Sequence, residues 1–250
     1  GDNALGMLID YGAPEDAAPL DRRVRLNAAS AAPGKANVAF LGAGNYAGRV
    51  LLPAFKAAGA TLSTVVSSGG VSAVHFGKKY GIAEAATDAA AVLADPGIDT
   101  IVVATRHNAH AAQVLAALRA GKHVFCEKPL CLTLADLDEI ETEARARPDQ
   151  LLMVGFNRRF APQVVKMKAL LTAVDMPKTF VMTVNAGEIP ADHWTQDAAV
   201  GGGRIIGEAC HFIDLLCHLA GASIVQARGL ALGPHPALTV RDDKAVITLQ

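Results

Sequence analysis

Two charged side chains stand together in Glu127-Lys128-Pro129, directly after the apolar run from His123 to Cys126. Such a run is typical of a strand that is buried on both faces of a parallel sheet. Open α/β sheets bind their ligands at the carboxyl ends of the strands, and the proline makes the turn there rigid. We therefore predict that Lys128 presents a fixed ammonium group at a ligand site. The plain alternative is a solvated lysine in a surface loop.

A second candidate for proton transfer is His211, on a segment whose spacing predicts a helix over residues 204–219. At α-helical spacing, His211, Asp214 and His218 share one side of this helix. Asp214 is then placed to orient the imidazole, and histidine is the side chain that most often exchanges protons near neutral pH. A histidine that only caps the helix, or is bonded within the core, is the alternative.

Cysteine and histidine also stand next to each other in this helix, at Cys210, His211, Cys217 and His218. Adjacent residues of a helix diverge, and this spacing matches no structural zinc pattern. The four cysteines form no CxxC pair, and the chain is too large to depend on disulfides. We expect no metal site and reduced thiols.

The segment FLGAGNYAGRVLLPAF, which starts at residue 40, has the pattern of a phosphate-binding turn between a strand and a helix. Gly42 permits the tight turn, Gly44 lets the backbone approach a pyrophosphate, and Ala47 takes the third position, where Gly or Ala allows close packing. The helix expected after the loop directs its amide dipole at the phosphates. A plain tight turn is the alternative. The predicted cofactor contacts in the loop are Gly42, Gly44, Asn45, Tyr46 and Ala47.

The next expected strand ends in Ser67 and Ser68, at the place where a carboxylate commonly binds the ribose of NAD. No carboxylate is present to repel a 2′-phosphate, and the hydroxyls can bond one, although no arginine accompanies them. We therefore expect NAD or NADP with a lean toward NADP, and predict both serines as cofactor contacts.

Short β-branched runs alternate with helical patterns from residue 37 onward, which predicts a doubly wound parallel sheet of the Rossmann class over residues 36–156. The expected strands are residues 37–41, 62–66, 100–104, 123–126 and 151–156. The expected helices are residues 45–58, 72–80, 88–94, 109–120 and 134–146. This sheet would bring the glycine loop and the Glu-Lys-Pro turn to one edge.

After residue 156 the pattern changes to an α+β unit with an open, mostly antiparallel sheet, assigned to residues 157–250. Its expected elements are helices over 162–171 and 204–219, strands over 179–185, 224–231 and 245–250, and a hairpin turn at 241–244. The chain stops within a strand, so we expect this unit to be incomplete. Residues 1–35, with LIDYG at 8–12 and several prolines, are expected to be a linker or the tail of a preceding domain.

The charge pattern excludes several classes of partner. The 250 residues include 23 basic and 24 acidic side chains, and the two signs are interspersed. We therefore expect neither nucleic acid nor a membrane surface as a partner. No segment is long and apolar enough to span a bilayer, and residues 1–30 lack the pattern of a secretory signal. We expect a cytoplasmic protein.

Three stretches, taken with the glycine loop, resemble the glucose-fructose oxidoreductase/inositol dehydrogenase family, often called Gfo/Idh/MocA. They are VVATRHNAHAAQVLAALRAGKHVFCEKPL from Val102, VGFNRRFAP from Val154 and GGGRIIGEACHFIDLL from Gly201. The resemblance implies a Rossmann domain and a second α/β domain whose open sheet often mediates homo-oligomers. It also implies NAD- or NADP-dependent chemistry at a hydroxyl or carbonyl carbon of a sugar, inositol or nucleotide sugar. The leader resembles the junction to a preceding alcohol dehydrogenase-like domain.

The resemblance also implies roles for single residues. Lys128 would lie beside the nicotinamide and bond the reacting oxygen, Glu127 would position the cofactor or the loop, and His211 would be the second catalytic group. Thr105 and His107 would contact the nicotinamide side. The expected substrate contacts are Asn157, Arg158, Trp194 and Asp214. Solvated arginines, and a tryptophan that only anchors its loop, are the alternatives.

The chain departs from the family pattern four residues before His211, where many members carry an acid and this chain has Gly207. Glu208 follows, but at α-helical spacing its side chain points about 100° away. It can replace the acid only if the backbone is not α-helical there. Two rival functions therefore stay open: a dinucleotide-binding regulatory subunit without turnover, and a non-redox lyase or hydrolase that recycles hydride internally.

Overall fold

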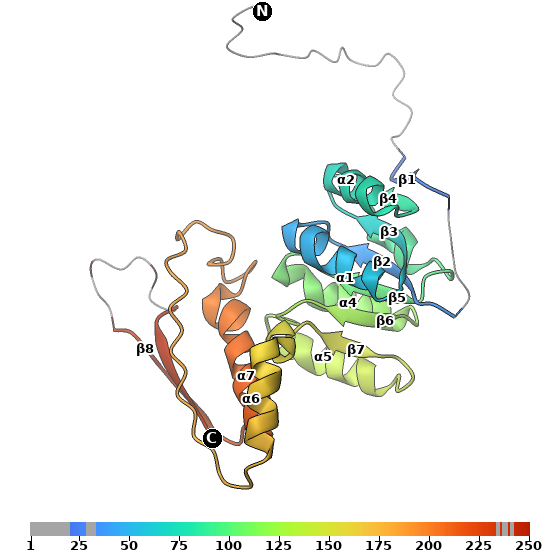
Figure 1. Ribbon diagram of the computed structural model, residues 1–250. Helices are drawn as coiled ribbons and strands as arrows, with labels where there is room; N and C mark the ends of the chain where they lie inside the picture. The colour runs from blue at the N-terminus through green and yellow to red at the C-terminus, as the bar shows by residue number, and fades with distance from the viewer. Residues whose placement is uncertain (1–20, 29–33, 234–235, 237–239, 241–242) are drawn as a thin grey trace, which may run out of the picture.

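The computed structural model describes residues 21–28, 34–233, 236, 240 and 243–250 (Figure 1). Within these residues, seven strands form one sheet in the order β1-β4-β3-β2-β5-β6-β7. The strands are β1 Arg23–Arg25, β2 Asn37–Leu41, β3 Thr61–Val66, β4 Glu84–Ala86, β5 Thr100–Val103, β6 His123–Cys126 and β7 Leu152–Val154. Strands β2 to β7 pair in parallel, and β1 pairs antiparallel with β4.

The two central strands, β2 and β5, border the crevice of the sheet. From β2 the chain builds β3 and β4 on one side and then returns to build β5, β6 and β7 on the other. Strands β2 and β5 pair from Val38 opposite Thr100 to Leu41 opposite Val103. The direction of winding reverses between them, so their carboxyl ends leave the crevice in which such sheets bind ligands.

Helices cover both faces of this sheet (Figure 1). They are α1 Leu52–Ala57, α2 Val71–Tyr80, α3 Ala89–Leu93, α4 His110–Arg119 and α5 Leu134–Arg145. Helices α1 and α2 pack with Phe40 and Val65 in one core, and α3, α4 and α5 pack with Ile101 and Leu118 in the other. These four side chains are fully buried, and each such burial contributes about 1.5–3 kcal/mol to stability. The predicted doubly wound sheet is confirmed.

The C-terminal part contains two helices and a small antiparallel sheet. The helices are α6 Pro162–Thr172 and α7 Cys210–Ala220, and the strands are β8 Ala227–Ala231 and β9 Ala245–Leu249. Figure 1 shows α6 and α7 side by side, with β8 on the side of them that faces away from the large sheet. The predicted antiparallel pairing of the last two strands is confirmed.

One expected strand, over residues 179–185, is wrong. These residues form neither helix nor strand in the structure. Their alternating apolar side chains match a strand pattern, but Val181 is 93% exposed and no neighbouring strand pairs with the segment among the described residues. An extended segment becomes a strand only when a neighbour pairs with its backbone groups, and side-chain alternation does not supply that neighbour.

Part of the expected linker also belongs to the sheet. Arg23–Arg25 form the edge strand β1, and the Arg23 guanidinium contacts the carboxylates of Glu84 and Asp95. A single valine between arginines gives no strand pattern, so the sequence did not predict β1. Strand β4, with the sequence EAA, was not predicted either, because these three residues also give no strand pattern. The LIDYG stretch and residues 241–242 of the expected turn lie outside the described residues.

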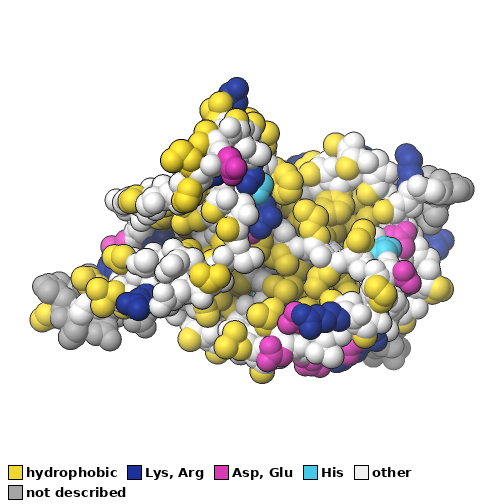
Figure 2. All heavy atoms as spheres, turned by 90° about the horizontal axis from the view of Figure 1, so that it is seen from below, with side chains coloured by type: hydrophobic (Ala, Val, Ile, Leu, Met, Phe, Trp, Pro, Cys, Tyr) yellow, Lys and Arg dark blue, Asp and Glu magenta, His cyan; other side chains and the backbone are white. Residues whose placement is uncertain are grey.

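Apolar side chains remain at the surface, mostly in the C-terminal part. Val165 and Leu170 of α6 and Leu230 of β8 are each more than half exposed. Seen from below, the molecule has a central hollow in which apolar side chains gather (Figure 2). Within the described part of the chain, no helix has the length and apolarity needed to cross a membrane.

Candidate active site

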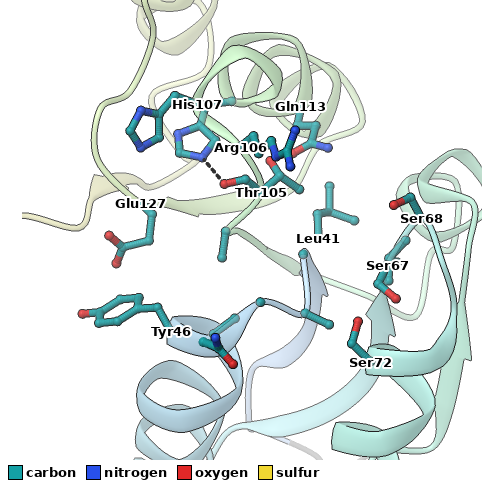
Figure 3. Close-up of a pocket in the computed structure, with 18 of the residues that line it drawn as sticks. Leu41, Tyr46, Ser67, Ser68, Ser72, Thr105, Arg106, His107, Gln113 and Glu127 are labelled. Carbon is teal, nitrogen blue, oxygen red and sulfur yellow. Dashed lines mark hydrogen bonds between the residues drawn. The ribbon is translucent and has the colours of Figure 1, made fainter. Parts of the chain in front are cut away.

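A cavity of about 1150 Å³ lies at the carboxyl edge of the large sheet, and Figure 3 shows residues of the Rossmann part around it. Residues of the C-terminal part also line this cavity. Most residues that the sequence singled out meet here. They are Gly42, Gly44, Asn45, Tyr46, Ala47, Ser67, Ser68, Thr105, His107, Glu127, Lys128, Asn157, Trp194 and His211. Arg158 and Asp214 do not line this cavity.

The glycines of the loop differ in what surrounds them. Gly42 has φ +103°, and a Cβ there would lie 2.3 Å from the carbonyl oxygen of Ala104, so the turn requires glycine. At Gly48 a Cβ would lie 2.1 Å from the ring of Phe76 in α2, so this glycine allows the close helix packing. At Gly44 a Cβ would meet nothing within 4 Å. The loop is therefore open to the cavity at Gly44, which fits a diphosphate against the backbone.

The carboxyl end of β3 offers hydroxyl groups and no charged side chain. Ser67, Ser68 and Ser72 line the cavity here, as Figure 3 shows. Ser67 accepts the backbone N–H of Ala73 at 3.3 Å, which ties the strand end to helix α2. Sequence reasoning missed Ser72, although a hydroxyl in the first turn of a helix next to the loop could have indicated it. This end of the cavity can bond a ribose or a phosphate without repelling either.

The end of β5 connects the two parts of the chain. Thr105 donates from Oγ1 to Gln113 Oε1 at 2.7 Å. His107 Nδ1 lies 2.8 Å from the carbonyl oxygen of Gly201, which identifies Nδ1 as the protonated nitrogen because a carbonyl only accepts. The ring of Trp194 packs against His107 edge to face, with centroids 4.9 Å apart. These contacts hold the loop that carries Trp194 over the cavity.

Lys128 reaches from the end of β6 to the start of the C-terminal helix. Its Nζ donates to the carbonyl oxygen of Gly207 at 2.8 Å and to Glu208 Oε1 at 3.0 Å. Its side chain is 14% exposed, whereas that of Glu208 is 42% exposed. The amine is therefore held at the cavity wall by a carbonyl and a carboxylate from the other part of the chain.

The backbone around Gly207 and Glu208 is not α-helical. Ile205–Ala209 form a π-helical turn that runs directly into α7. The α-helical rotation of 100° per residue does not apply in such a turn. Glu208 accordingly lines the cavity with Lys128, and Gly207 contributes its carbonyl oxygen. The chain thus meets the condition under which Glu208 can replace the missing acid.

His211 lies in α7 with its side chain almost fully buried, at 6% exposure. Its Nδ1 has no hydrogen-bond partner among the described residues. Burial, followed by the positive charges of Lys128 and Arg158, lowers the pKa of His211 from its ordinary 6.5 to about 4. The imidazole is therefore neutral at physiological pH and can accept a proton.

Asp214 does not orient His211, contrary to the sequence expectation. Both of its carboxylate oxygens accept from Arg159, one of them from Nε at 2.7 Å. The spacing along the helix was read correctly, but a partner from another element takes the carboxylate. The Arg158 guanidinium lies 4.5 Å from the Phe212 ring centroid and lines a second cavity, which shares Glu208 with the first. Its predicted substrate contact stays a prediction.

Glu127 and Tyr46 face each other across the cavity (Figure 3). Glu127 is 9% exposed, and its Oε1 has no partner among the described residues. Burial raises the pKa of its carboxyl group. The Tyr46 hydroxyl accepts from Asn157 Nδ2 at 2.8 Å, and its pKa is raised by burial and by the charge of Glu127. A carboxyl group and a hydroxyl group at one cavity wall fit a ligand that carries hydroxyl groups.

The fold and the site define a class of protein. A Rossmann sheet with an open glycine loop holds a lysine, a carboxylate and a neutral histidine at the same cavity, which is the arrangement of a dinucleotide-binding oxidoreductase. A family model described as "Oxidoreductase family, NAD-binding Rossmann fold" matches residues 36–156. The chain belongs to this Gfo/Idh/MocA family.

Characterised relatives share the resemblance. The myo-inositol 2-dehydrogenase of Thermotoga maritima is 33% identical over 176 residues, which are 69% of this chain and 52% of the relative. The inositol 2-dehydrogenase 2 of Saccharopolyspora erythraea is 38% identical over 181 residues, which are 67% of this chain and 51% of the relative. The chain therefore spans about half the length of these curated relatives.

A solved structure resembles the chain over both of its parts. The 3-ketoreductase of Actinomadura kijaniata, in complex with NADP and TDP-benzene, is 25% identical with a TM-score of 0.63. The match covers 77% of this chain and 60% of that one. The fold predicted from the sequence is thus the fold of known oxidoreductases.

Proposed function

We propose that this chain is the coenzyme-binding and proton-transfer part of an NAD(P)-dependent dehydrogenase that acts on a secondary hydroxyl or carbonyl group of a polyol or sugar. The observation that carries the proposal is the meeting of Lys128, Glu208 and His211 at the cavity that the glycine loop opens. Hydride transfer at a substrate carbon requires a proton to leave or join the neighbouring oxygen, and these groups can exchange it.

The residues that would hold the coenzyme lie along the cavity, and each group of them would contact a different part of the coenzyme. The loop at Gly44 is open to a diphosphate, and the serines after β3 suit the adenosine ribose. Glu127 and Thr105 lie at the end where the nicotinamide would be placed. When bound there, the nicotinamide supplies the hydride acceptor or donor.

Proton transfer falls to Lys128, with Glu208 and His211 beside it. Glu208 balances the charge of the ammonium group and holds it at 3.0 Å, and the carbonyl of Gly207 fixes its direction. His211 lines the cavity with a neutral imidazole, so it can accept a hydrogen bond from a substrate hydroxyl group. Three groups at one wall suit a substrate with several adjacent hydroxyl groups.

The substrate end of the cavity favours an uncharged ring. Trp194 offers an indole at the wall, and indole faces pack well against sugar-like rings. The relatives named as inositol dehydrogenases point to cyclic polyols and similar sugars as the substrate class. We therefore infer an inositol-like or sugar substrate.

The coenzyme preference follows from the end of β3. Three serines line the cavity there without a carboxylate, so a 2′-phosphate meets hydroxyl donors and no repulsion. We infer that NADP is accepted at least as well as NAD. The related 3-ketoreductase was solved with NADP.

The test uses the only tryptophan of the chain, because Trp194 lines the cavity and its fluorescence reports directly on the site. NADH or NADPH should quench it. A panel of inositols and sugars with NAD and NADP should then give reduced coenzyme, and Lys128→Ala should abolish this turnover while coenzyme still quenches Trp194. Lys78→Ala, on the exposed side of α2, is the matched control. Coenzyme binding without turnover on the whole panel would favour the regulatory subunit instead.

A further inference from the structure

His110 is buried where two loops of the cavity meet, and the proposed chemistry does not use it. It is the first residue of α4 and is 1% exposed. Its Nδ1 lies 2.7 Å from the carbonyl oxygen of Pro129, and its Nε2 lies 3.2 Å from the carbonyl oxygen of Thr105. One imidazole therefore bridges the loops that follow the neighbouring strands β5 and β6.

The two contacts of this ring are not equivalent. Carbonyl oxygens only accept, and a neutral imidazole carries a single N–H. Burial lowers the pKa of His110, with the charge of Lys128 acting in the same direction and the carbonyls of Pro129 and Thr105 opposing it. A neutral ring places its proton on Nδ1, because that contact is the shorter one. His110 thus donates one buried hydrogen bond to the carbonyl of Pro129.

Pro129 directly follows the lysine of the site. The Lys128 side chain is long, and it must hold its amine against Gly207 and Glu208 on another part of the chain. A flexible lysine reaches one geometry reliably only when its own backbone is fixed. The buried bond from His110 fixes that backbone one residue away.

We propose that His110 is a positioning residue, which holds Lys128 within reach of Glu208 by donating from Nδ1 to the carbonyl oxygen of Pro129. The inference rests on the proposed function of Lys128. His110 itself does not act on substrate, because both of its ring nitrogens face backbone carbonyls.

Three variants distinguish a positioning role of His110 from a general structural role. His110→Asn keeps a donor, since the amide nitrogen of asparagine lies near the place of Nδ1. His110→Leu removes the donor and keeps an apolar side chain. His75→Leu changes an exposed histidine of α2, far from the cavity lining, and is the matched control.

The first measurement needs no turnover. Lysines are methylated reductively with isotope-labelled formaldehyde, and the Lys128 signal in the NMR spectrum is assigned by its loss in Lys128→Arg. We expect His110→Leu to move this signal toward the position of exposed lysines, and His110→Asn and His75→Leu to leave it unchanged. In the second measurement, kcat should fall about 10- to 100-fold in His110→Leu, with the NADPH dissociation constant within about twofold of the original. His110→Asn should recover most of kcat.

A Lys128 signal in His110→Leu that coincides with the unchanged protein would overturn the proposal, as would an asparagine variant that is as impaired as the leucine variant. If His110→Leu does not fold, His110→Gln takes its place, because its amide lies near Nε2 and cannot reach Pro129. If the unchanged protein turns over nothing on the panel, the proposed function fails, and the NMR measurement still decides the role of His110.

Discussion

The amine of Lys128 lies 3.0 Å from Oε1 of Glu208, although 80 residues separate them along the chain. The contact joins the end of a Rossmann strand to the π-helical turn before α7. Many family members carry an acid four residues before the histidine, and this chain has Gly207 there. This ion pair is therefore the feature of the site that distinguishes the chain from the family pattern, and the first prediction concerns it.

Glu208→Gln should lower kcat about 100-fold and leave the NADPH dissociation constant within about twofold, because the amide keeps the size of the side chain but not its charge. Steady-state kinetics and Trp194 fluorescence measure the two quantities. Glu188→Gln, an exposed position outside the catalytic cavity, is the control. An added Gly207→Asp should not restore activity, since its Cβ would lie 3.1 Å from His107 Cε1. Full activity of Glu208→Gln would remove the carboxylate from the mechanism.

Gly44→Val should fold normally and lose coenzyme binding. A Cβ at this position meets no protein atom within 4 Å, and the valine side chain would extend into the space left for the diphosphate. Thermal unfolding should give the original Tm, and titration with NADPH should no longer quench Trp194. Gly42→Ala is the contrasting variant, because its Cβ would strike the Ala104 carbonyl, and it should lose about 3 kcal/mol of stability. Retained binding in a folded Gly44→Val protein would place the coenzyme elsewhere.

Ser68→Asp should weaken NADPH binding at least about tenfold and leave NADH binding unchanged or tighter. A carboxylate at the end of β3 repels the 2′-phosphate and can accept from the ribose hydroxyls of NADH. Titrations of both reduced coenzymes against Trp194 fluorescence measure the effect. Thr179→Asp, at an exposed position away from the cavity lining, serves as the control for added charge. Equal weakening of both coenzymes would show that Ser68 does not lie at the ribose.

The protein should lose stability as the pH falls, because of His211. Its folded-state pKa is about 4, against an ordinary value of 6.5, so only the unfolded chain binds this proton between those values. The contribution is fully present above pH 6.5 and is lost as the pH falls toward 4, by up to about 3 kcal/mol. In urea denaturation, the free energy of unfolding of the unchanged protein should therefore fall by up to about 3 kcal/mol more than that of His211→Leu between pH 6.5 and pH 4. Parallel profiles would contradict the lowered pKa.

Glu127→Gln should stabilise the protein at alkaline pH and cost activity. Burial raises the pKa of Glu127 above its ordinary 4.5, so the folded state favours the neutral carboxyl group and loses stability as the pH rises through the folded-state value. A neutral amide removes this cost at pH 8 and gives little gain at pH 4. Thermal or urea unfolding at the two pH values measures it. A gain of the same size at both values would mean that the charge of Glu127 is not the cause.

Local patterns were enough to predict the large sheet and the residues of the glycine loop that line the cavity. Strands such as β2 and β5 are continuous apolar runs, and the glycines of the loop stand at a strand-to-helix turn, so neighbouring residues carry the information. The same holds for Lys128, which directly follows β6. Strands β1 and β4 were not predicted because they are short and lack such a run.

Contacts between distant elements decided the rest. Helical spacing predicted Asp214 beside His211, but both of its carboxylate oxygens accept from Arg159, which lies in the short 3₁₀ turn Asn157–Phe160 before α6. α-Helical spacing also predicted that Glu208 points away from the site, whereas a π-helical turn places it against Lys128. The sequence by itself determined which strands and loops form, because hydrophobic periodicity and glycine geometry act over a few residues. Only the tertiary structure decided which charged groups pair, because ion pairs depend on distances between elements that no local pattern records.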